Sequence, residues 1–261
     1  MKASINYYVA MNIGILLDKT LDQYQINAIE MILQNPAFNI KLAVINDNSG
    51  KIGRDFLRKK LNKDLGQTYS SNEFFREVDI DILTTSKPGS PKNISIIRSY
   101  SPDVLILLDG FKSINKTLLD LTSFGVISYH FGDLRKYRGE PPAFWELYNG
   151  KSEMVVTVQK LTERCSCGLP VLEKKVEITY YDDVKSLREK AFRASEEMML
   201  KALYKIQDKT FKPETIKLYG RIYNIPSLKE YSSLLYRLAS RKLQHKAQEV
   251  IKSKTKEPNY I

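Results

Sequence analysis

The chain has 261 residues, of which 43% are hydrophobic, and it carries a formal net charge of +11. This length allows one well-buried core and a smaller appendage. No run of about eighteen apolar residues exists, so a membrane-spanning helix is not expected, and the short apolar stretch near the N-terminus ends at Asp18, which argues against a cleaved signal peptide. We therefore expect a cytoplasmic protein without a transmembrane segment.

The positive charge is concentrated at the end of the chain. Residues 201–261 contain 14 Lys and Arg against 5 Asp and Glu, a net charge of +9, whereas the first 200 residues contain 27 against 25, a net charge of +2. A basic tail of this kind suits nucleic acid, an anionic membrane surface or an acidic partner. A solvated helix face followed by a frayed end explains the same charges equally well.

The two cysteines, Cys165 and Cys167, form a single CxC pair without a second pair or a nearby histidine. A structural zinc site needs about four ligands. We therefore expect no metal site and interpret both residues as free thiols in a loop.

Apolar strands and a helical pattern alternate at the start of the chain. Strands are expected over residues 13–17 and 40–45, and a helix over 23–33, where isoleucines recur at helical spacing. A strand, helix and strand in this order favour a parallel sheet. The turn over residues 17–21 lacks the glycines with which dinucleotide-binding folds hold phosphates, so a nicotinamide or flavin site is disfavoured.

The pattern continues with short elements up to a long helix. In chain order we expect a charged helical stretch (51–75), a short strand or extended segment (78–83), a helix (94–99), a strand (104–108), a helix (115–121), strands (126–129 and 155–160), an edge strand (173–179) and a long helix (184–206). The strand over 104–108 is the most apolar and is expected at the centre of the sheet. Asp182 and Asp183 should stabilise the N-terminus of the long helix.

A last helix is expected after Ser227, with an apolar stripe and basic residues around it. This amphipathic helix can pack on the body of the protein or on a second chain, which leaves a homo-oligomer open. We therefore predict an α/β fold with a doubly wound, mostly parallel sheet in residues 1–183, followed by a helical C-terminal extension with a basic tail in residues 184–261.

The stretch from Gly125 to Gly150 holds one of the two histidines, His130, and the only tryptophan, Trp145. A histidine at the end of a strand and before a loop rich in Gly and Pro lies where open α/β sheets place their chemistry. The alternative is a structural histidine in a surface turn. We expect Trp145 to be a core residue, because large aromatic side chains dominate cores.

A compound motif runs through this stretch and beyond it, made of Gly125, His130, Leu134, Tyr137-Arg138-Gly139, Pro142, Trp145, Asn149-Gly150, Val156-Thr157 and Gly168. This motif resembles the formyltransferase family that uses 10-formyltetrahydrofolate, which includes methionyl-tRNA, glycinamide-ribonucleotide and amino-sugar formyltransferases. The resemblance covers roughly residues 11–180 and implies a Rossmann-like variant with its site at the carboxyl ends of the central strands.

The resemblance assigns catalytic positions, of which this chain keeps one. The family uses an Asn, a His two residues later and an Asp further downstream, and here these positions are Ser128, His130 and Ser166. Asn and His donate hydrogen bonds to the oxygen that becomes negative when an amine attacks a formyl carbon, and loss of one such donor costs about 3–4 kcal/mol. Asp133 and Glu163 are nearby acids that lie off the family position.

The resemblance also implies binding residues. Leu108, Asp109, Gly110 and Phe111 would line the folate pocket, whereas Tyr137, Arg138 and Gly139 would touch the substrate or hold the loop. The expected reaction is formyl transfer from 10-formyltetrahydrofolate to a small-molecule amine, with amino-sugar nucleotides as candidates. Two alternatives stay open: a catalytically degenerate binding or regulatory protein, and a polyanion-binding protein that acts through its basic C-terminus.

Overall fold

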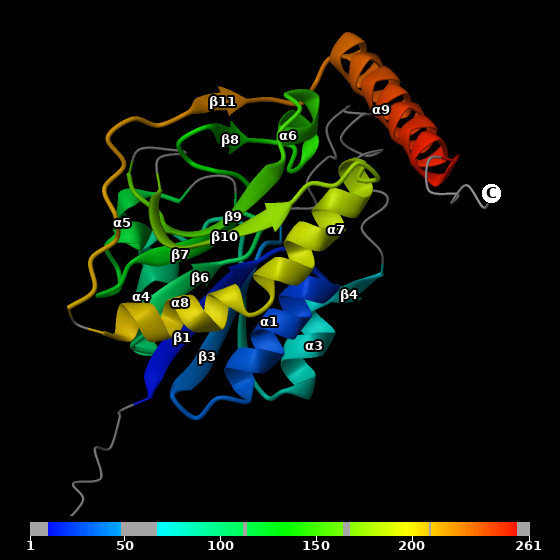
Figure 1. Ribbon diagram of the computed structural model, residues 1–261. Coiled ribbons are helices and arrows are strands. Elements are labelled where there is room, and N and C mark those ends of the chain that lie inside the picture. The colour runs from blue at the N-terminus through cyan, green and yellow to red at the C-terminus, as the bar shows by residue number, and fades with distance from the viewer. Residues whose placement is uncertain (1–9, 48–66, 112–113, 164–167, 209, 255–261) are drawn as a thin grey trace, which may run out of the picture.

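A central seven-stranded sheet organises the protein (Figure 1). The computed structural model describes residues 10–47, 67–111, 114–163, 168–208 and 210–254. The strand order is β10-β9-β7-β6-β1-β3-β5; β5, β3, β1, β6 and β7 run parallel, and β9 and β10 continue the sheet antiparallel. The strands are β1 (Met11–Leu17), β3 (Phe38–Ile45), β5 (Asp81–Thr84), β6 (Val104–Leu107), β7 (Val126–His130), β9 (Glu153–Lys160) and β10 (Leu169–Glu177). The predicted α/β fold with a mostly parallel sheet is confirmed.

Helices cover both faces of this sheet. In Figure 1, α1, α7 and α8 lie in front of the sheet, whereas α4 and α5 lie behind it. The helices are α1 (Gln23–Leu33), α3 (Ser71–Glu77), α4 (Pro91–Ser99), α5 (Lys116–Leu119), α6 (Phe144–Tyr148), α7 (Val184–Ser195), α8 (Met198–Gln207) and α9 (Leu228–Lys254). Two short sheets accompany them: β2 (Thr20–Asp22) pairs with β4 (Thr68–Ser70), and β8 (Tyr137–Gly139) pairs with β11 (Arg221–Tyr223).

The two faces of the sheet form separate hydrophobic cores because side chains alternate along each strand. In β1, Ile13, Ile15 and Leu17 join the core under α1, α7 and α8, whereas Leu16 joins the core under α4 and α5. The buried side chains of α7 and α8, among them Leu187 and Leu203, belong to the first of these cores. The division of the chain at residue 183 into two domains stays a prediction.

The helix expected over residues 184–206 is interrupted, and that expectation was wrong. α7 ends at Ser195 and α8 begins at Met198. The Tyr129 hydroxyl of β7 donates to the Ser195 carbonyl oxygen at 2.9 Å and accepts from the backbone N–H of Met199. These two backbone groups would otherwise bond to each other, so the side chain inserted between them breaks the helix.

The strand expected from residue 78 begins later. Val78 caps the C-terminus of α3, and Asp79 adopts a positive φ of 55°, so the extended backbone of β5 starts at Asp81. Ser70 caps the N-terminus of α3 by accepting from the backbone N–H of Glu73. Most of the charged helical stretch expected over residues 51–75 lies outside the described residues.

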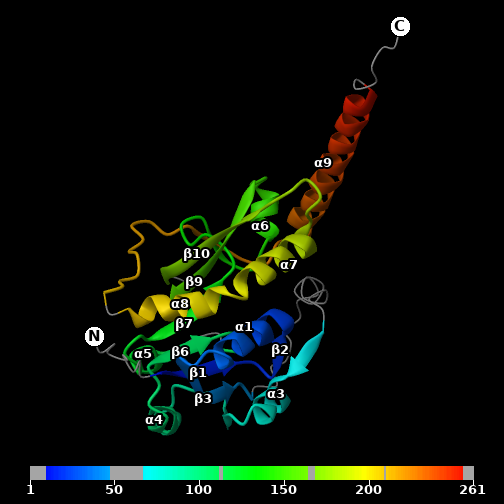
Figure 2. The ribbon, with the colours of Figure 1, turned by 60° about the horizontal axis from the view of Figure 1, so that its bottom comes forward.

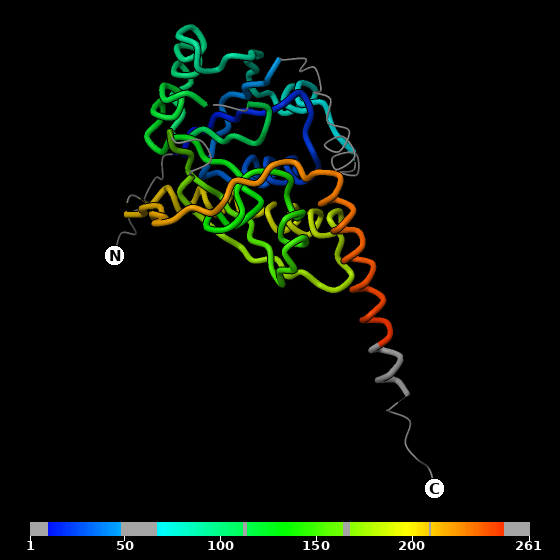
Figure 3. The backbone as a smooth tube through the Cα atoms, turned by 90° about the horizontal axis from the view of Figure 1, so that it is seen from above, coloured from blue at the N-terminus to red at the C-terminus, as the bar shows by residue number. Residues whose placement is uncertain are grey.

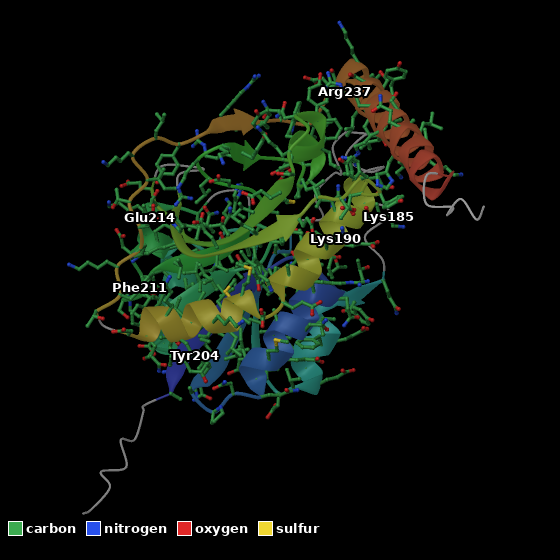
Figure 4. All side chains as sticks on the ribbon, in the orientation of Figure 1. Lys185, Lys190, Tyr204, Phe211, Glu214 and Arg237 are labelled. Carbon is green, nitrogen blue, oxygen red and sulfur yellow. The ribbon has the colours of Figure 1, made fainter. Side chains whose placement is uncertain are left out.

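After α8 the chain runs back along the protein to β8 (Figure 1). Glu214 in this segment forms an ion pair with Arg135 at 3.1 Å (Figure 4). β11 then adds to β8, and α9 extends away from the body in Figures 2 and 3. Leu234 and Leu238 anchor α9 in the core, whereas further leucines and tyrosines along it are exposed. Within the described residues, no helix has the length and apolar character needed to cross a bilayer.

Candidate functional site

A pocket of about 290 Å³ opens at the carboxyl ends of β6 and β7. Its walls come from these strand ends, from the start of α1, from the loop after β7, from α7 and from the segment before α9. In an open α/β sheet, this edge is where ligands usually bind. The lining residues are Asp22, Tyr24, Leu108, Asp109, Tyr129, His130, Phe131, Gly139, Glu140, Pro141, Pro142, Arg188, Phe192 and Ile225.

His130 is the last residue of β7, and its imidazole is held by the following loop. Its Nε2 lies 2.8 Å from the carbonyl oxygen of Tyr137. A carbonyl only accepts, so Nε2 carries the proton and Nδ1 of the neutral ring carries the lone pair. Gly132 allows this approach because a Cβ there would lie 2.9 Å from Nε2 and 2.6 Å from the Tyr137 oxygen. The loop therefore fixes both the orientation and the tautomer of the ring.

Burial lowers the pKa of His130 below its usual value of 6.5. The hydrogen bond to Tyr137 and the charge of Asp133 raise this pKa, and the charge of Arg138 lowers it, but the effect of burial is the largest. The imidazole is consequently neutral at pH 7. A neutral imidazole with a free lone pair can accept a proton.

Asp133 is the acid whose charge reaches His130. Its residue is 9% exposed, and its carboxylate accepts from the backbone N–H of Arg135 at 2.9 Å. Glu163, the other acid near the motif, forms an exposed ion pair with Lys116 at 2.9 Å. Of these two acids, Asp133 is the one whose charge acts on the imidazole.

Ser128 lies on the same strand as His130, and its hydroxyl accepts from Nε2 of Gln159 at 3.3 Å. Ser128 is 5% exposed and is not among the residues that line the pocket. Ser166 lies outside the described residues, as do Cys165 and Cys167. Of the three predicted catalytic residues, the structure brings His130 to the pocket, and the roles of Ser128 and Ser166 stay predictions.

Of the four residues in the predicted folate-binding loop, two line the pocket and two contact other parts of the protein. Leu108 and Asp109 line the pocket. The Gly110 carbonyl accepts from the side chain of Asn46 at 2.5 Å, and Phe111 packs against the core under α4 and α5. Half of this segment thus faces the pocket, and the other half attaches it to the neighbouring strand ends.

The motif Tyr137-Arg138-Gly139 connects the loop after β7 to the C-terminal segment. The Tyr137 ring stacks on Tyr223 with 5.5 Å between centroids, and Arg138 Nε donates to the Gly220 carbonyl at 2.7 Å. Gly139 has a φ of +95° and approaches the Tyr223 backbone so closely that no Cβ fits. Tyr137 and Arg138 hold the loop, whereas Gly139 reaches the pocket.

Trp145 is 9% exposed and belongs to the core, as expected. Its Nε1 donates to the Asn224 carbonyl at 3.1 Å, and its ring lies 4.8 Å from that of Tyr223. The C-terminal segment is therefore bound by the same motif that carries the histidine.

Sequence reasoning missed the pocket wall opposite His130. This wall contains Asp22, Tyr24, Arg188 and Phe192, and the rings of Tyr24 and Phe192 stack with 4.3 Å between centroids. Burial raises the pKa of Asp22, the charge of Asp109 raises it further, and the charge of Arg188 lowers it. No sequence pattern unites these residues, because α1 and α7 meet only in the fold.

The pocket fits part of a folate formyl donor. Its volume lies at the lower end of the range of about 300–1,000 Å³ that is usual for small-molecule sites. Apolar and aromatic walls with a few polar groups suit a ring system and its formyl group. Within the described residues, no group of three or more His, Cys, Asp or Glu side chains could hold a metal ion.

The chain is similar to known formyltransferases in sequence. The sequence model of the formyl transferase family matches residues 22–203. Methionyl-tRNA formyltransferase of Caldicellulosiruptor saccharolyticus is 24% identical over 183 residues, which cover 70% of this chain and 56% of that protein. The corresponding protein of Thermodesulfovibrio yellowstonii is 30% identical over 139 residues, 52% of this chain and 44% of that protein. The chain thus spans about half the length of these relatives.

Solved structures share the fold at low sequence identity. Glycinamide ribonucleotide transformylase 1 of Symbiobacterium toebii has a TM-score of 0.60 and 16% identity, with 81% of this chain and 95% of that chain covered. The N-formyltransferase of Helicobacter canadensis, in complex with folinic acid and dTDP-3-aminofucose, has a TM-score of 0.58 and 17% identity, with 81% and 70% covered.

Proposed function

Because the chain belongs to the formyl transferase family, we propose that it transfers a formyl group from 10-formyltetrahydrofolate to the nitrogen of a small-molecule amine. The observation that carries this proposal is the state of His130. A neutral imidazole lines the pocket, with Nε2–H bound to the Tyr137 carbonyl and the lone pair on Nδ1. This is the arrangement that a proton acceptor for an attacking amine requires.

The donor, when bound, supplies an electrophilic formyl carbon. The acceptor nitrogen must lose a proton as its new bond to carbon forms, and we assign the role of proton acceptor to Nδ1 of His130. The negative charge of Asp133 favours the resulting imidazolium. The protonated ring can then donate a hydrogen bond or return the proton to the leaving nitrogen.

The remaining walls would orient the two reactants. We assign Leu108 and Asp109 to the donor side, because they directly follow β6, the strand that pairs with β7. We assign Asp22, Tyr24 and Arg188 to the acceptor side, where carboxylate and guanidinium groups can bind the polar parts of an amine. Amino-sugar nucleotides are the first acceptors to test, because the Helicobacter canadensis neighbour was solved with such a compound and with folinic acid.

A second candidate is a related protein that binds these ligands without turnover. It is favoured by Ser128, whose buried hydroxyl is bound to Gln159 instead of lining the pocket. An oxyanion donor from that position is then missing, and such a loss alone reduces turnover by about 100- to 1,000-fold.

Two measurements test the proposal and separate it from the alternative. Calorimetric titration with 5-formyltetrahydrofolate, a stable analogue of the donor, should show saturable binding, and its absence at millimolar concentration would refute the folate site. A formyl-transfer assay against a panel of amino-sugar nucleotides and simple amino sugars then decides between an enzyme and a binding protein. Replacement of the half-buried His245 by Asn is the matched control for His130→Asn.

A further inference from the structure

The last helix, α9, carries two sets of apolar side chains, and only one set packs on the protein. Leu234 and Leu238 belong to the core under α1, α7 and α8. The helix then projects beyond the body (Figures 2 and 3). The second set is exposed to solvent, and we call it the outer face of α9. It consists of Leu228, Leu235, Tyr236 and Leu243, which are 72%, 51%, 76% and 70% exposed.

The outer face forms a row along the helix. Leu235 follows Leu228 by seven residues, which is close to two helical turns, and the same spacing separates Tyr236 from the last leucine of the row. The row therefore keeps one direction over fifteen residues, or about 22 Å of helix. A straight row of this length suits a flat apolar surface, because a short groove would contact only one end of it.

Contacts with the body determine which side of α9 is free. Arg237 donates to the Tyr148 carbonyl at 2.7 Å (Figure 4). One turn later, Arg241 donates to the Asp182 carbonyl at 2.7 Å. His245 stacks on a tyrosine ring in the loop before α7, with 4.7 Å between centroids. These contacts hold one side of the helix against the body over about two turns, so the outer face stays directed away from it.

Positive charge accompanies the outer face. Residues 228–247 contain five Lys and Arg against one Glu, a net charge of +4. Lys242 and Lys246 are exposed and lie within one turn of Leu243, on the side of the outer face. The one acid, Glu230, is engaged in the helix cap, because its Oε2 accepts from the backbone N–H and the hydroxyl of the capping serine, both at 2.8 Å. The charge around the row is therefore complementary to an anionic surface.

We propose that the outer face of α9 binds an anionic phospholipid bilayer. The leucines and the tyrosine enter the boundary between headgroups and acyl chains, and the lysines contact the negative headgroups. Exposed apolar side chains beside positive charges fit an occupant that is apolar and anionic at once. RNA offers negative charge without an apolar surface for leucines, and a second copy of α9 would place like charges next to each other. The proposal does not rest on formyl transfer.

Flotation of the full chain with lipid vesicles tests the proposal. Vesicles of phosphatidylcholine with about one-third phosphatidylglycerol should bind the chain at least about tenfold more tightly than vesicles of phosphatidylcholine alone. Raising the salt concentration from about 0.1 to 0.5 M should weaken binding to the anionic vesicles, because salt screens charges at a surface. Equal binding to both lipid compositions, or binding to neither, would overturn the proposal.

Two variants locate the contact on the helix. Leu235→Ser with Leu243→Ser should weaken binding to the anionic vesicles by at least about tenfold, because apolar area that enters the bilayer is lost. Leu218→Ser, at an 81% exposed leucine outside α9, should leave the binding unchanged. Both leucines of the pair are exposed, so the urea midpoint of this variant should stay close to the native one. Native affinity in the folded leucine variant would refute the outer face as the contact.

Fluorescence distinguishes the bilayer from other occupants. Tyr236→Trp adds an exposed indole to a chain whose only tryptophan, Trp145, is buried. Its emission should shift to shorter wavelength on the anionic vesicles, whereas that of Tyr204→Trp, on α8, should not. A shift that appears with RNA, or on self-association without lipid, and not with vesicles would show that nucleic acid or a second copy covers the outer face, and would overturn the proposal.

Discussion

Raising the pH from 5 to 8 should destabilise the fold through one buried carboxyl group, that of Glu146. The pKa of this group is about 7 in the folded chain, against an ordinary value of 4.5. The folded state therefore keeps a proton that the unfolded chain releases between these values. Stability is fully present below pH 4.5 and is lost as the pH rises towards 7. With about 1.4 kcal/mol for each pKa unit, the loss between pH 5 and 8 is about 2–3 kcal/mol.

Glu146→Gln isolates this contribution. The amide cannot titrate, so the free energy of unfolding of the variant relative to the native chain should improve by about 2–3 kcal/mol between pH 5 and pH 8. Urea denaturation, followed by the fluorescence of the single Trp145, measures it. The unfolding free energy of Glu153→Gln should change with pH as that of the native chain does, and the same behaviour in Glu146→Gln would refute the raised pKa of this buried carboxyl group.

Three further changes test separate parts of the structure. Asp133→Asn should lower the pKa of His130 and move the acid limb of the pH–rate profile to lower pH, because a charge that favours the imidazolium is removed; an unmoved limb would contradict this. Tyr129→Phe should cost about 1–3 kcal/mol in urea, because two buried backbone groups at the break between α7 and α8 lose their partner, and a smaller loss would show that the helix closes without it. If the basic tail binds polyanions, Lys242→Ala with Lys246→Ala should weaken salt-sensitive RNA binding by α9. Filter binding at two salt concentrations measures this affinity, and an unchanged affinity would contradict a role of these two lysines.

Secondary structure could be predicted from the sequence where apolar residues recur at a regular spacing over a whole strand or helix. The strand ending at Leu17 and the helix over residues 23–33 were predicted from apolar spacing, and the structure confirms both. The position of His130 at a strand end was also predicted from the apolar run before it. These features are local, so short segments of the chain specify them.

The parts that could not be predicted depend on distant segments. β8 and β11 have three residues each, too few for a periodic signal, and their first paired residues, Tyr137 and Arg221, are 84 positions apart. The break between α7 and α8 depends on the Tyr129 hydroxyl, which comes from β7. The pocket wall that contains Arg188 exists only after α7 packs on the sheet. Each of these features depends on contacts between segments that are far apart in the sequence, and only the break between α7 and α8 overrides a helical pattern.

The most direct test of the proposed reaction is a single-turnover measurement of formyl transfer from 10-formyltetrahydrofolate to an amine accepted by the native chain, compared with His130→Asn. Loss of a positioned general base should reduce the rate by about 100- to 10,000-fold, while 5-formyltetrahydrofolate still binds the variant. An unchanged rate in a variant that binds the analogue would contradict the role given to His130, and the account of the site would fail with it.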